Sequence, residues 1–412
     1  MLPRAAVAMG VWACTLGCNE LSGLSGLEKV DCAGGTCTGQ AGGGGTGGTT
    51  TTSTGVAGAS SYAPSIAAFT LGRHGACVTD GNDGLTRCWG AMIGNGTAGV
   101  ETRPALAAGG LELAGVGHGF DHRCGYDSIG NVWCWGGNDF GQLGDGTDVT
   151  RVEPAQVTGL TEVERLSHGA HHTCAMTVSG GLFCWGANRQ GQLGTGDTLD
   201  RSTPTEITGF TDVLRLACGT YSSCLVLTTG EVYCWGLNDH GQLGFDPQTD
   251  PVVLTPRQIP GIPAMERIYP GHETMCSRTL GTRLMYCWGD NEFGQLGDGT
   301  NLSTHVPQQV DQIDEVGVAF PGMKHTCVVD TTDAAYCWGA NDHGQLGVST
   351  ATPAVNLPQL VADSVKAFGA KTAESTCYAD WQDAIYCTGL NDSGQLGDGT
   401  YDSRDSFEPV LF

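Results

Sequence analysis

Short apolar runs alternate with glycine-rich polar turns along most of the chain. In one stretch, apolar runs at residues 173–177 and 182–185 flank a polar turn at residues 178–181. Two such runs separated by a short turn with glycine indicate a β-hairpin. Each run holds a cysteine, and the pattern recurs seven times, with the second cysteines 46, 50, 50, 53, 50 and 50 residues apart. A period of this length is typical of a propeller blade or another repeat array.

Two further apolar runs accompany each hairpin. One lies just before it, as at residues 163–166, and the other begins with proline, as at Pro154, Pro204, Pro256, Pro307 and Pro358. We interpret the second run as a strand whose first residue is proline, because the missing N–H costs no ladder bond there. Four short strands per unit, seven times over, predict an all-β fold, a seven-bladed β-propeller.

The two ends of the repeat array predict how the ring closes. The first copy starts at residue 65 with no proline run before it, and the last copy ends with a surplus run at residues 409–412. We therefore expect the C-terminal strand to pair into the first blade and remove the open sheet edge.

The cysteines indicate an oxidising compartment. Fourteen of the nineteen fall into seven pairs, ten or eleven residues apart. Partners across a hairpin lie about 4.5–5.5 Å apart at Cα, which a disulfide can span. The close spacing of cysteines in metal sites is absent. We predict disulfides within the pairs Cys77 and Cys88, Cys124 and Cys134, Cys174 and Cys184, Cys224 and Cys234, Cys276 and Cys287, Cys327 and Cys337, and Cys377 and Cys387. Cys218 is left over, and we predict a small buried residue there.

The start of the chain has the pattern of an export signal. A short basic head precedes an apolar run at residues 5–16, and the segment 1–18 ends at Cys18. That ending resembles a bacterial lipoprotein box, in which Cys18 is lipidated, although Thr15 stands where such boxes carry leucine. Ordinary secretion is the alternative. No later run reaches 18 apolar residues, so we expect membrane contact only through a lipid anchor in the bacterial cell envelope, at the outer membrane.

Residues 19–61 and 62–412 differ in composition. The first segment is rich in Gly, Thr and Ser and predicts a flexible tether, in which Cys32 and Cys37 close a small loop. The second holds the repeats, and we expect it to be the propeller and a monomer. The chain carries 43 acidic and 19 basic residues, for a net charge of −24, which argues against a nucleic-acid partner.

One motif within the repeats resembles a known family. The pattern C-W-G-x-N-x-x-G-Q-L-G occurs at residues 184–194, 234–244 and 287–297, with Asp-Gly-Thr following it in several copies. This resembles the regulator-of-chromosome-condensation repeat. Met92-Ile93-Gly94 and Thr388 depart from it. The resemblance implies a seven-bladed propeller used as a binding surface. The eukaryotic founder looks like a nucleotide-exchange factor for a small nuclear GTPase that also binds chromatin, and secreted bacterial members include propellers similar to an inhibitor of β-lactamases.

The recurring residues predict structure rather than chemistry. We expect the Trp and Gly-Gln-Leu-Gly residues to hold each blade to the next. His122, His172 and His325 share one repeated position, which favours structural hydrogen bonding over a metal site. The Asp-Gly-Thr segments read as turns, since they lack the alternating acidic ligands of a calcium loop. We predict no catalytic, cofactor-binding or metal-binding residue.

One repeated position holds unlike residues. Three residues before each first cysteine stand His74, Asp121, His171, Tyr221, Glu273, Lys324 and Glu374. Seven equivalent sites with unlike side chains are what a partner-binding rim would show, and unconstrained exposed loops would show the same.

These observations predict a cell-surface or secreted propeller that binds a protein partner and has no enzymatic activity. One alternative is a carbohydrate-binding or hydrolytic propeller, which a carboxylate pair or an aromatic platform in the central channel would favour. The other is an exchange factor, which the export signal, the paired cysteines and the acidity oppose.

Overall fold

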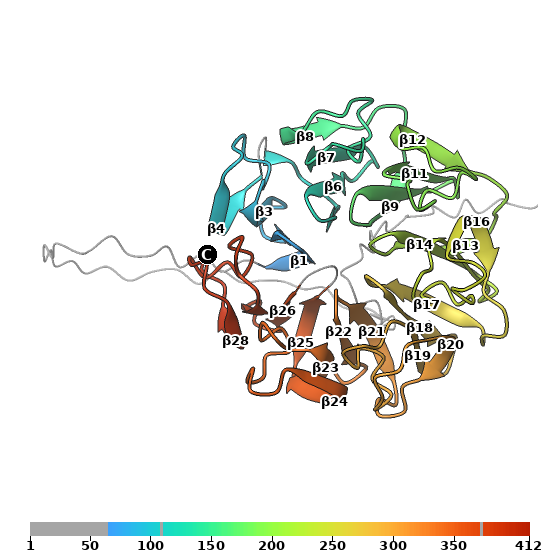
Figure 1. The fold of residues 1–412 in the computed structure, drawn as a ribbon. Coiled ribbons are helices and arrows are strands. Elements are labelled where there is room, and N and C mark those ends of the chain that lie inside the picture. Colours follow the sequence, from blue (N-terminus) through green and yellow to red (C-terminus); the bar gives the residue numbers. More distant parts are fainter. Residues whose placement is uncertain (1–64, 108–109, 371–373) are drawn as a thin grey trace, which may run out of the picture.

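Seven four-stranded antiparallel sheets surround a common axis in the computed structural model of the chain (Figure 1). The structure describes residues 65–107, 110–370 and 374–412. These residues contain no helix long and apolar enough to cross a membrane. The predicted all-β, seven-bladed propeller is confirmed. Segments 1–18 and 19–61, with Cys18, Cys32 and Cys37, lie outside the described residues.

Each blade takes its four strands in chain order, from the axis outwards. The innermost strands are β1 (Ile66–Gly72), β5 (Gly115–His118), β9 (Val163–His168), β13 (Val213–Cys218), β17 (Met265–Pro270), β21 (Val316–Pro321) and β25 (Val365–Gly369). The second strands are β2 (Gly75–Asp80), β6 (His122–Tyr126), β10 (His172–Thr177), β14 (Ser222–Leu227), β18 (Thr274–Thr279), β22 (His325–Asp330) and β26 (Ser375–Asp380).

The third and fourth strands complete each blade towards the outer wall. The third strands are β3 (Thr86–Ala91), β7 (Val132–Gly136), β11 (Leu182–Gly186), β15 (Val232–Leu237), β19 (Met285–Gly289), β23 (Ala335–Ala340) and β27 (Ile385–Gly389). The outer strands are β4 (Val100–Leu106), β8 (Arg151–Gln156), β12 (Arg201–Ile207), β16 (Val252–Gln258), β20 (Thr304–Gln309), β24 (Ala354–Ala362) and β28 (Arg404–Pro409).

All seven predicted hairpin disulfides are present. Each joins the second and third strands of one blade, where the two cysteines face each other in the ladder with Cα atoms 4.0–4.1 Å apart. The seven bridges are buried between neighbouring blades. Cys218 forms none of them and is fully buried, as predicted for a small core residue.

The proline runs lie elsewhere in the blade than we expected. Pro154 is the fourth residue of β8, which is the outermost strand of the second blade. It lies beside a bulge in the β7–β8 ladder. An outer strand has one edge without a partner, so a residue that lacks an N–H is tolerated within it and not only at its start. The runs therefore end each blade rather than begin it.

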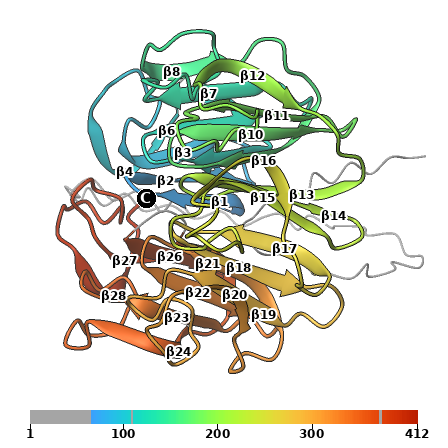
Figure 2. The ribbon, with the colours of Figure 1, turned by 45° about the vertical axis from the view of Figure 1, so that its right-hand side comes forward.

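Ring closure differs from the prediction for the same reason. The first blade is completed by its own outer strand β4, which holds Pro104, and β28 pairs with β27 in the seventh blade. The C-terminus lies between β4 and β28 in both views (Figures 1 and 2). The described ends of the array meet through loop and side-chain contacts, among them Phe412 packed edge-on against Trp89.

One hydrogen-bond pattern joins most neighbouring blades. The indole Nε1–H of Trp185 donates to the backbone carbonyl of Gln142 in the preceding blade, and Thr173 Oγ1–H donates to the same oxygen. Trp235, Trp288 and Trp338 repeat the indole bond, and Trp89 bonds the carbonyl of Gln395 across the junction between the seventh and first blades. The predicted role of the Trp and Gly-Gln-Leu-Gly residues is therefore confirmed.

The repeated histidines extend this pattern. Nε2 of His122 lies 3.0 Å from Thr173 Oγ1 in the next blade. Because that hydroxyl already donates to a carbonyl, it accepts from the imidazole Nε2–H. His172 and His325 contact Ser223 and Thr376 in the same way. All three rings are buried, so these histidines are structural, as the repeat pattern predicted.

Candidate functional site

The seven predicted rim residues lie on one face of the ring. Each stands in, or at the end of, the loop that joins the innermost strand of a blade to the second strand, so the seven loops encircle the central channel. Lys324 is exposed and the other six are half-buried. The fold therefore brings together residues that are about 50 positions apart in the sequence.

A second ring of residues meets the rim, and the sequence analysis missed it. It is the residue before the Gly-Gln-Leu-Gly segment, and it is Phe140, Gln190, His240, Phe293, His343 and Ser393 in the second to seventh blades. Its identity changes from blade to blade inside an otherwise repeated motif, and that variation was the available signal. We call the rim residues and this second ring together the rim face.

Contacts within the rim face cross from blade to blade. Nδ1 of His171 lies 3.3 Å from Asp121 Oδ1, and the His171 ring packs against Phe140 of the preceding blade. The Lys324 ammonium lies 4.9 Å from the centre of the Phe293 ring. His74 Nδ1 lies 3.1 Å from Ser393 Oγ across the ring junction. His171, Lys324 and His74 therefore each rest on the second-ring residue of the blade before it.

Histidines and carboxylates meet repeatedly on this face. Glu273 Oε1 lies 3.4 Å from His272 Nδ1 and 3.9 Å from His240 Nδ1, and Glu374 lies 3.9 Å from His343. The hydrogen bond with His272 lowers the pKa of Glu273 below its ordinary value. Burial by itself lowers the pKa of His240, but the hydrogen bond with Asp239 and the charge of Glu273 outweigh this effect. The pKa of His240 therefore lies above its ordinary value. The rim face therefore loses net negative charge as its histidines become protonated.

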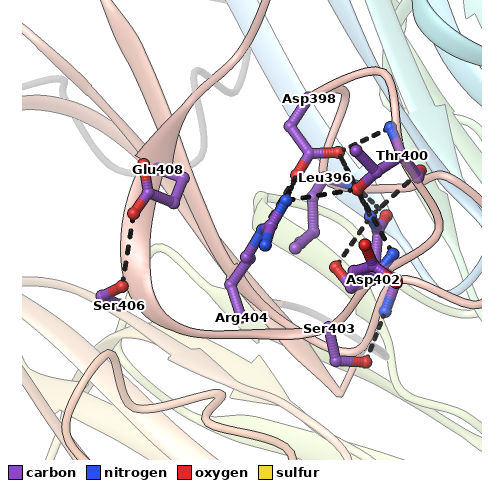
Figure 3. A network of polar contacts seen from close by, with 9 residues as sticks. Leu396, Asp398, Thr400, Asp402, Ser403, Arg404, Ser406 and Glu408 are labelled. Atoms are coloured by element: carbon purple, nitrogen blue, oxygen red, sulfur yellow. Dashed lines mark hydrogen bonds and ion pairs between the residues drawn. The ribbon is translucent and has the colours of Figure 1, made fainter.

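The frame beneath the rim face is a set of asparagine-centred loops. Asn391 Oδ1 accepts from the Leu396 N–H, and its amide donates to the carbonyls of Thr400 and Asp402. Arg404 bonds Asp398 within the same loop (Figure 3). Asn138 and Asn291 hold their loops in the same way. The Asp-Gly-Thr segments thus serve as turns, in agreement with the sequence reading.

A cavity of about 100 Å³ lies on the propeller axis at the innermost strands. Apolar side chains such as Phe69, Leu166 and Phe320 line it, together with His118, Arg165 and His168. No carboxylate is among the residues that line it. The carboxylate pair that would favour a hydrolytic propeller is therefore not found at this cavity.

One group of three possible metal ligands occurs among the described residues. The ligand atoms of His172, Cys174 and Cys218 lie within 4.8 Å of one another, and all three residues are buried. Cys174, however, is bonded to Cys184, so its sulfur is not available as a thiolate. The group is better described as packing between two blades than as a metal centre.

Comparison with known families decides what the repeat is. The model of the regulator of chromosome condensation (RCC1) repeat matches residues 130–176, 179–226, 229–272 and 284–329, and a second model of the same repeat matches 163–192, 213–242 and 322–345. These residues of the propeller are RCC1 repeats. No curated protein sequence matches it.

Solved structures agree with this propeller in fold. Prp20p from Saccharomyces cerevisiae aligns with a TM-score of 0.70 at 21% identity, covering 79% of this chain and 85% of that chain. Human WBSCR16 aligns with a TM-score of 0.71 at 19% identity, covering 79% and 93%. Yeast RCC1 (Prp20), solved bound to Kap60, aligns with a TM-score of 0.71 at 20% identity, covering 88% and 91%. At these identities the likeness establishes the fold alone.

Proposed function

We propose that this RCC1-repeat propeller is an exported, non-enzymatic module that binds a protein partner through its rim face. The observation that carries the proposal is a contrast between two sets of residues. The residues that join the blades repeat from blade to blade, whereas the residues in the two rings of the rim face differ. The frame residues are buried and satisfy one another, whereas the rim residues reach the surface beside the channel. Surface loops on a rigid scaffold are where proteins most often place their binding residues.

The seven disulfides support the exported location, since such bonds persist in oxidising compartments. We further propose that a lipid on Cys18 anchors the exported protein to the membrane. Partitioning of the mature protein into a detergent phase tests it. Wild type should enter that phase and a Cys18→Ser variant should not, and equal partitioning of the two would leave ordinary secretion.

The partner is unidentified, but the rim face indicates where its binding energy lies. Large aromatic and charged residues dominate most protein interfaces. Tyr221 packs edge-on against His272, and Lys324 projects over Phe293 as an exposed cation. Tyr221 and Lys324 are therefore the residues that we expect to carry the contact.

The test compares a rim variant with a variant on the opposite face. The double variant Tyr221→Ala, Lys324→Ala should lose at least tenfold in affinity for any partner that wild type captures from the native envelope, which corresponds to about 1.4 kcal/mol. Val178→Ala, in the exposed β10–β11 turn of the other face, should bind as wild type does. All three proteins must melt alike. Equal capture by wild type and by the rim variant would place the site on another face.

A further inference from the structure

The junction between the first and second blades departs from the pattern at the other junctions. The first blade lacks the four residues before the Gln-Leu-Gly position, so that Met92-Ile93-Gly94 stand where the second blade has Gln142-Leu143-Gly144. The replacement keeps the packing. Ile93 is fully buried as Leu143 is, and Gly94 approaches the Trp135 indole as Gly144 approaches that of Trp185. The Met92 carbonyl therefore takes the place of the glutamine carbonyl.

An arginine stands opposite this carbonyl. At the equivalent position the third, fourth, sixth and seventh blades have Thr173, Ser223, Thr326 and Thr376, whose hydroxyls donate to the glutamine carbonyl. The fifth blade has Met275 there. Arg123 Nη1 instead donates to Met92 O. Within the described residues, Trp135 Nε1 has no hydrogen-bond partner, although five other tryptophans bond a carbonyl at this point. Arg123 Nε also has none.

His118 extends this set to a row of three. His118 faces Arg123 across the β5–β6 ladder, and Arg123 faces Trp135 across the β6–β7 ladder. Directly opposed residues project to the same face of a sheet, so the three side chains share the face that turns towards the first blade. They are 6%, 3% and 0% exposed, and His118 Nε2 has no hydrogen-bond partner in the described part of the chain.

Arg123 is a buried positive charge without a counter-ion. Among the described residues no carboxylate forms an ion pair with it, in a chain whose net charge is −24. Burial lowers the pKa of Arg123 to about 10, so the guanidinium remains charged at neutral pH. Burying a charge without compensation costs several kcal/mol, on the order of the whole net stability of a domain. A bound anion would remove that cost.

The axis cavity gives such an anion a place beside the row. His118 lines it, together with Thr70 and Leu71 of the first blade and Arg165 of the third. Arg123 and Trp135, on the next two strands outwards, are not among the lining residues. A volume of about 100 Å³ admits an ion the size of acetate or phosphate with a water or two, since a water occupies roughly 30 Å³. Larger metabolites do not fit.

We propose that the axis cavity at the junction of the first and second blades binds a small oxyanion from solution. His118 contacts it as a neutral donor, and Arg123, one strand further out, supplies the nearby counter-charge. This junction differs from the others in two ways. The shortened loop of the first blade presents the Met92 carbonyl in place of a glutamine carbonyl, and Arg123 stands where other blades have threonine or serine. An ion bound there joins the two blades, as a pair of hydrogen bonds to one glutamine carbonyl does at three other junctions.

The test measures melting temperature against anion concentration. Wild-type protein is dialysed into a buffer whose anion is bulky, and phosphate, acetate or chloride is added at constant ionic strength. Phosphate or acetate should raise the melting temperature in a saturating manner. Arg123→Thr, which installs the residue used at three other junctions, should fold and lose at least tenfold in apparent affinity.

Two further variants keep the test decisive. Arg257→Gln removes a partly exposed arginine of the outer wall and should respond as wild type does. His118→Phe keeps the guanidinium but removes the donor that lines the cavity, and it should weaken the response at least a few-fold, which covers the case in which Arg123→Thr fails to fold. The proposal is overturned if neither oxyanion stabilises wild type, or if Arg123→Thr and His118→Phe respond as wild type does. A response to chloride alone would also overturn it, because the site would then hold a halide.

Discussion

Individual buried histidines make the stability of the ring depend on pH. Burial lowers the pKa of His122 and of His325 to about 4, and the nearby charge of Asp121 or Asp342 offsets only part of that shift. In the unfolded chain each imidazole titrates near 6.5. Between these values the unfolded state binds more protons than the folded state does. The neutral form therefore contributes stability above pH 6.5, which is lost as the pH falls towards 4.

Replacing one of these histidines should reduce the loss of stability in acid. A His325→Gln side chain can still donate to Thr376 Oγ1 but cannot titrate. Between pH 7 and pH 4.5, the free energy of unfolding of wild type should fall by roughly 2–3 kcal/mol more than that of the variant. Urea unfolding at the two pH values measures the difference. His305→Gln, on the outer strand β20, is the control and should follow wild type; parallel curves for His325→Gln and wild type would contradict the linkage.

At the scale of elements, the sequence was informative about strands and weaker about how they group. Cysteine pairs and apolar runs located the hairpins because each hairpin is a local object with its own turn. Whether Pro154 begins one blade or ends the previous one depends on a pairing with β7 across a long loop, and local pattern carries no information about that choice. The rim position was found from its variability, whereas Phe140 and its equivalents were hidden inside a motif read as uniform.

The asparagine-centred loops are the elements that set the rim face, and one substitution should show it. Asn391→Asp keeps the acceptor for the Leu396 N–H but removes the donor to the carbonyls of Thr400 and Asp402. Leaving these part-buried carbonyls without a donor should cost about 1–3 kcal/mol of unfolding free energy. Asn301→Asp, an exposed asparagine that also donates to a carbonyl, should change it by less than about 0.5 kcal/mol. Chemical denaturation of both variants measures this difference. If both variants lost the same unfolding free energy, the Asn391-centred loop would not be what sets the rim face.

For the molecule as a whole, the junction between the seventh and first blades uses the same bond as the other junctions. Trp89→Phe removes the donor to the Gln395 carbonyl, whereas Trp135→Phe removes an indole N–H that has no acceptor among the described residues. Both lose a similar volume. In buffer without small oxyanions, Trp89→Phe should therefore be less stable than Trp135→Phe by about 1 kcal/mol. Calorimetry of the pair gives this difference, and a zero or reversed difference would mean that the closing bond contributes nothing.

Every disulfide of the described chain lies inside a single hairpin, and none crosses from one blade to the next. Under a pulling force applied at its two ends, the ring can therefore come apart without breaking any covalent bond. Each blade would lengthen in its own step, shortened by the residues held between its two cysteines. At about 3.4 Å per extended residue, a closed loop of ten or eleven residues hides roughly 35 Å of length per blade. A reducing agent would release that hidden length, so the response of this molecule to tension should report the redox state of its surroundings.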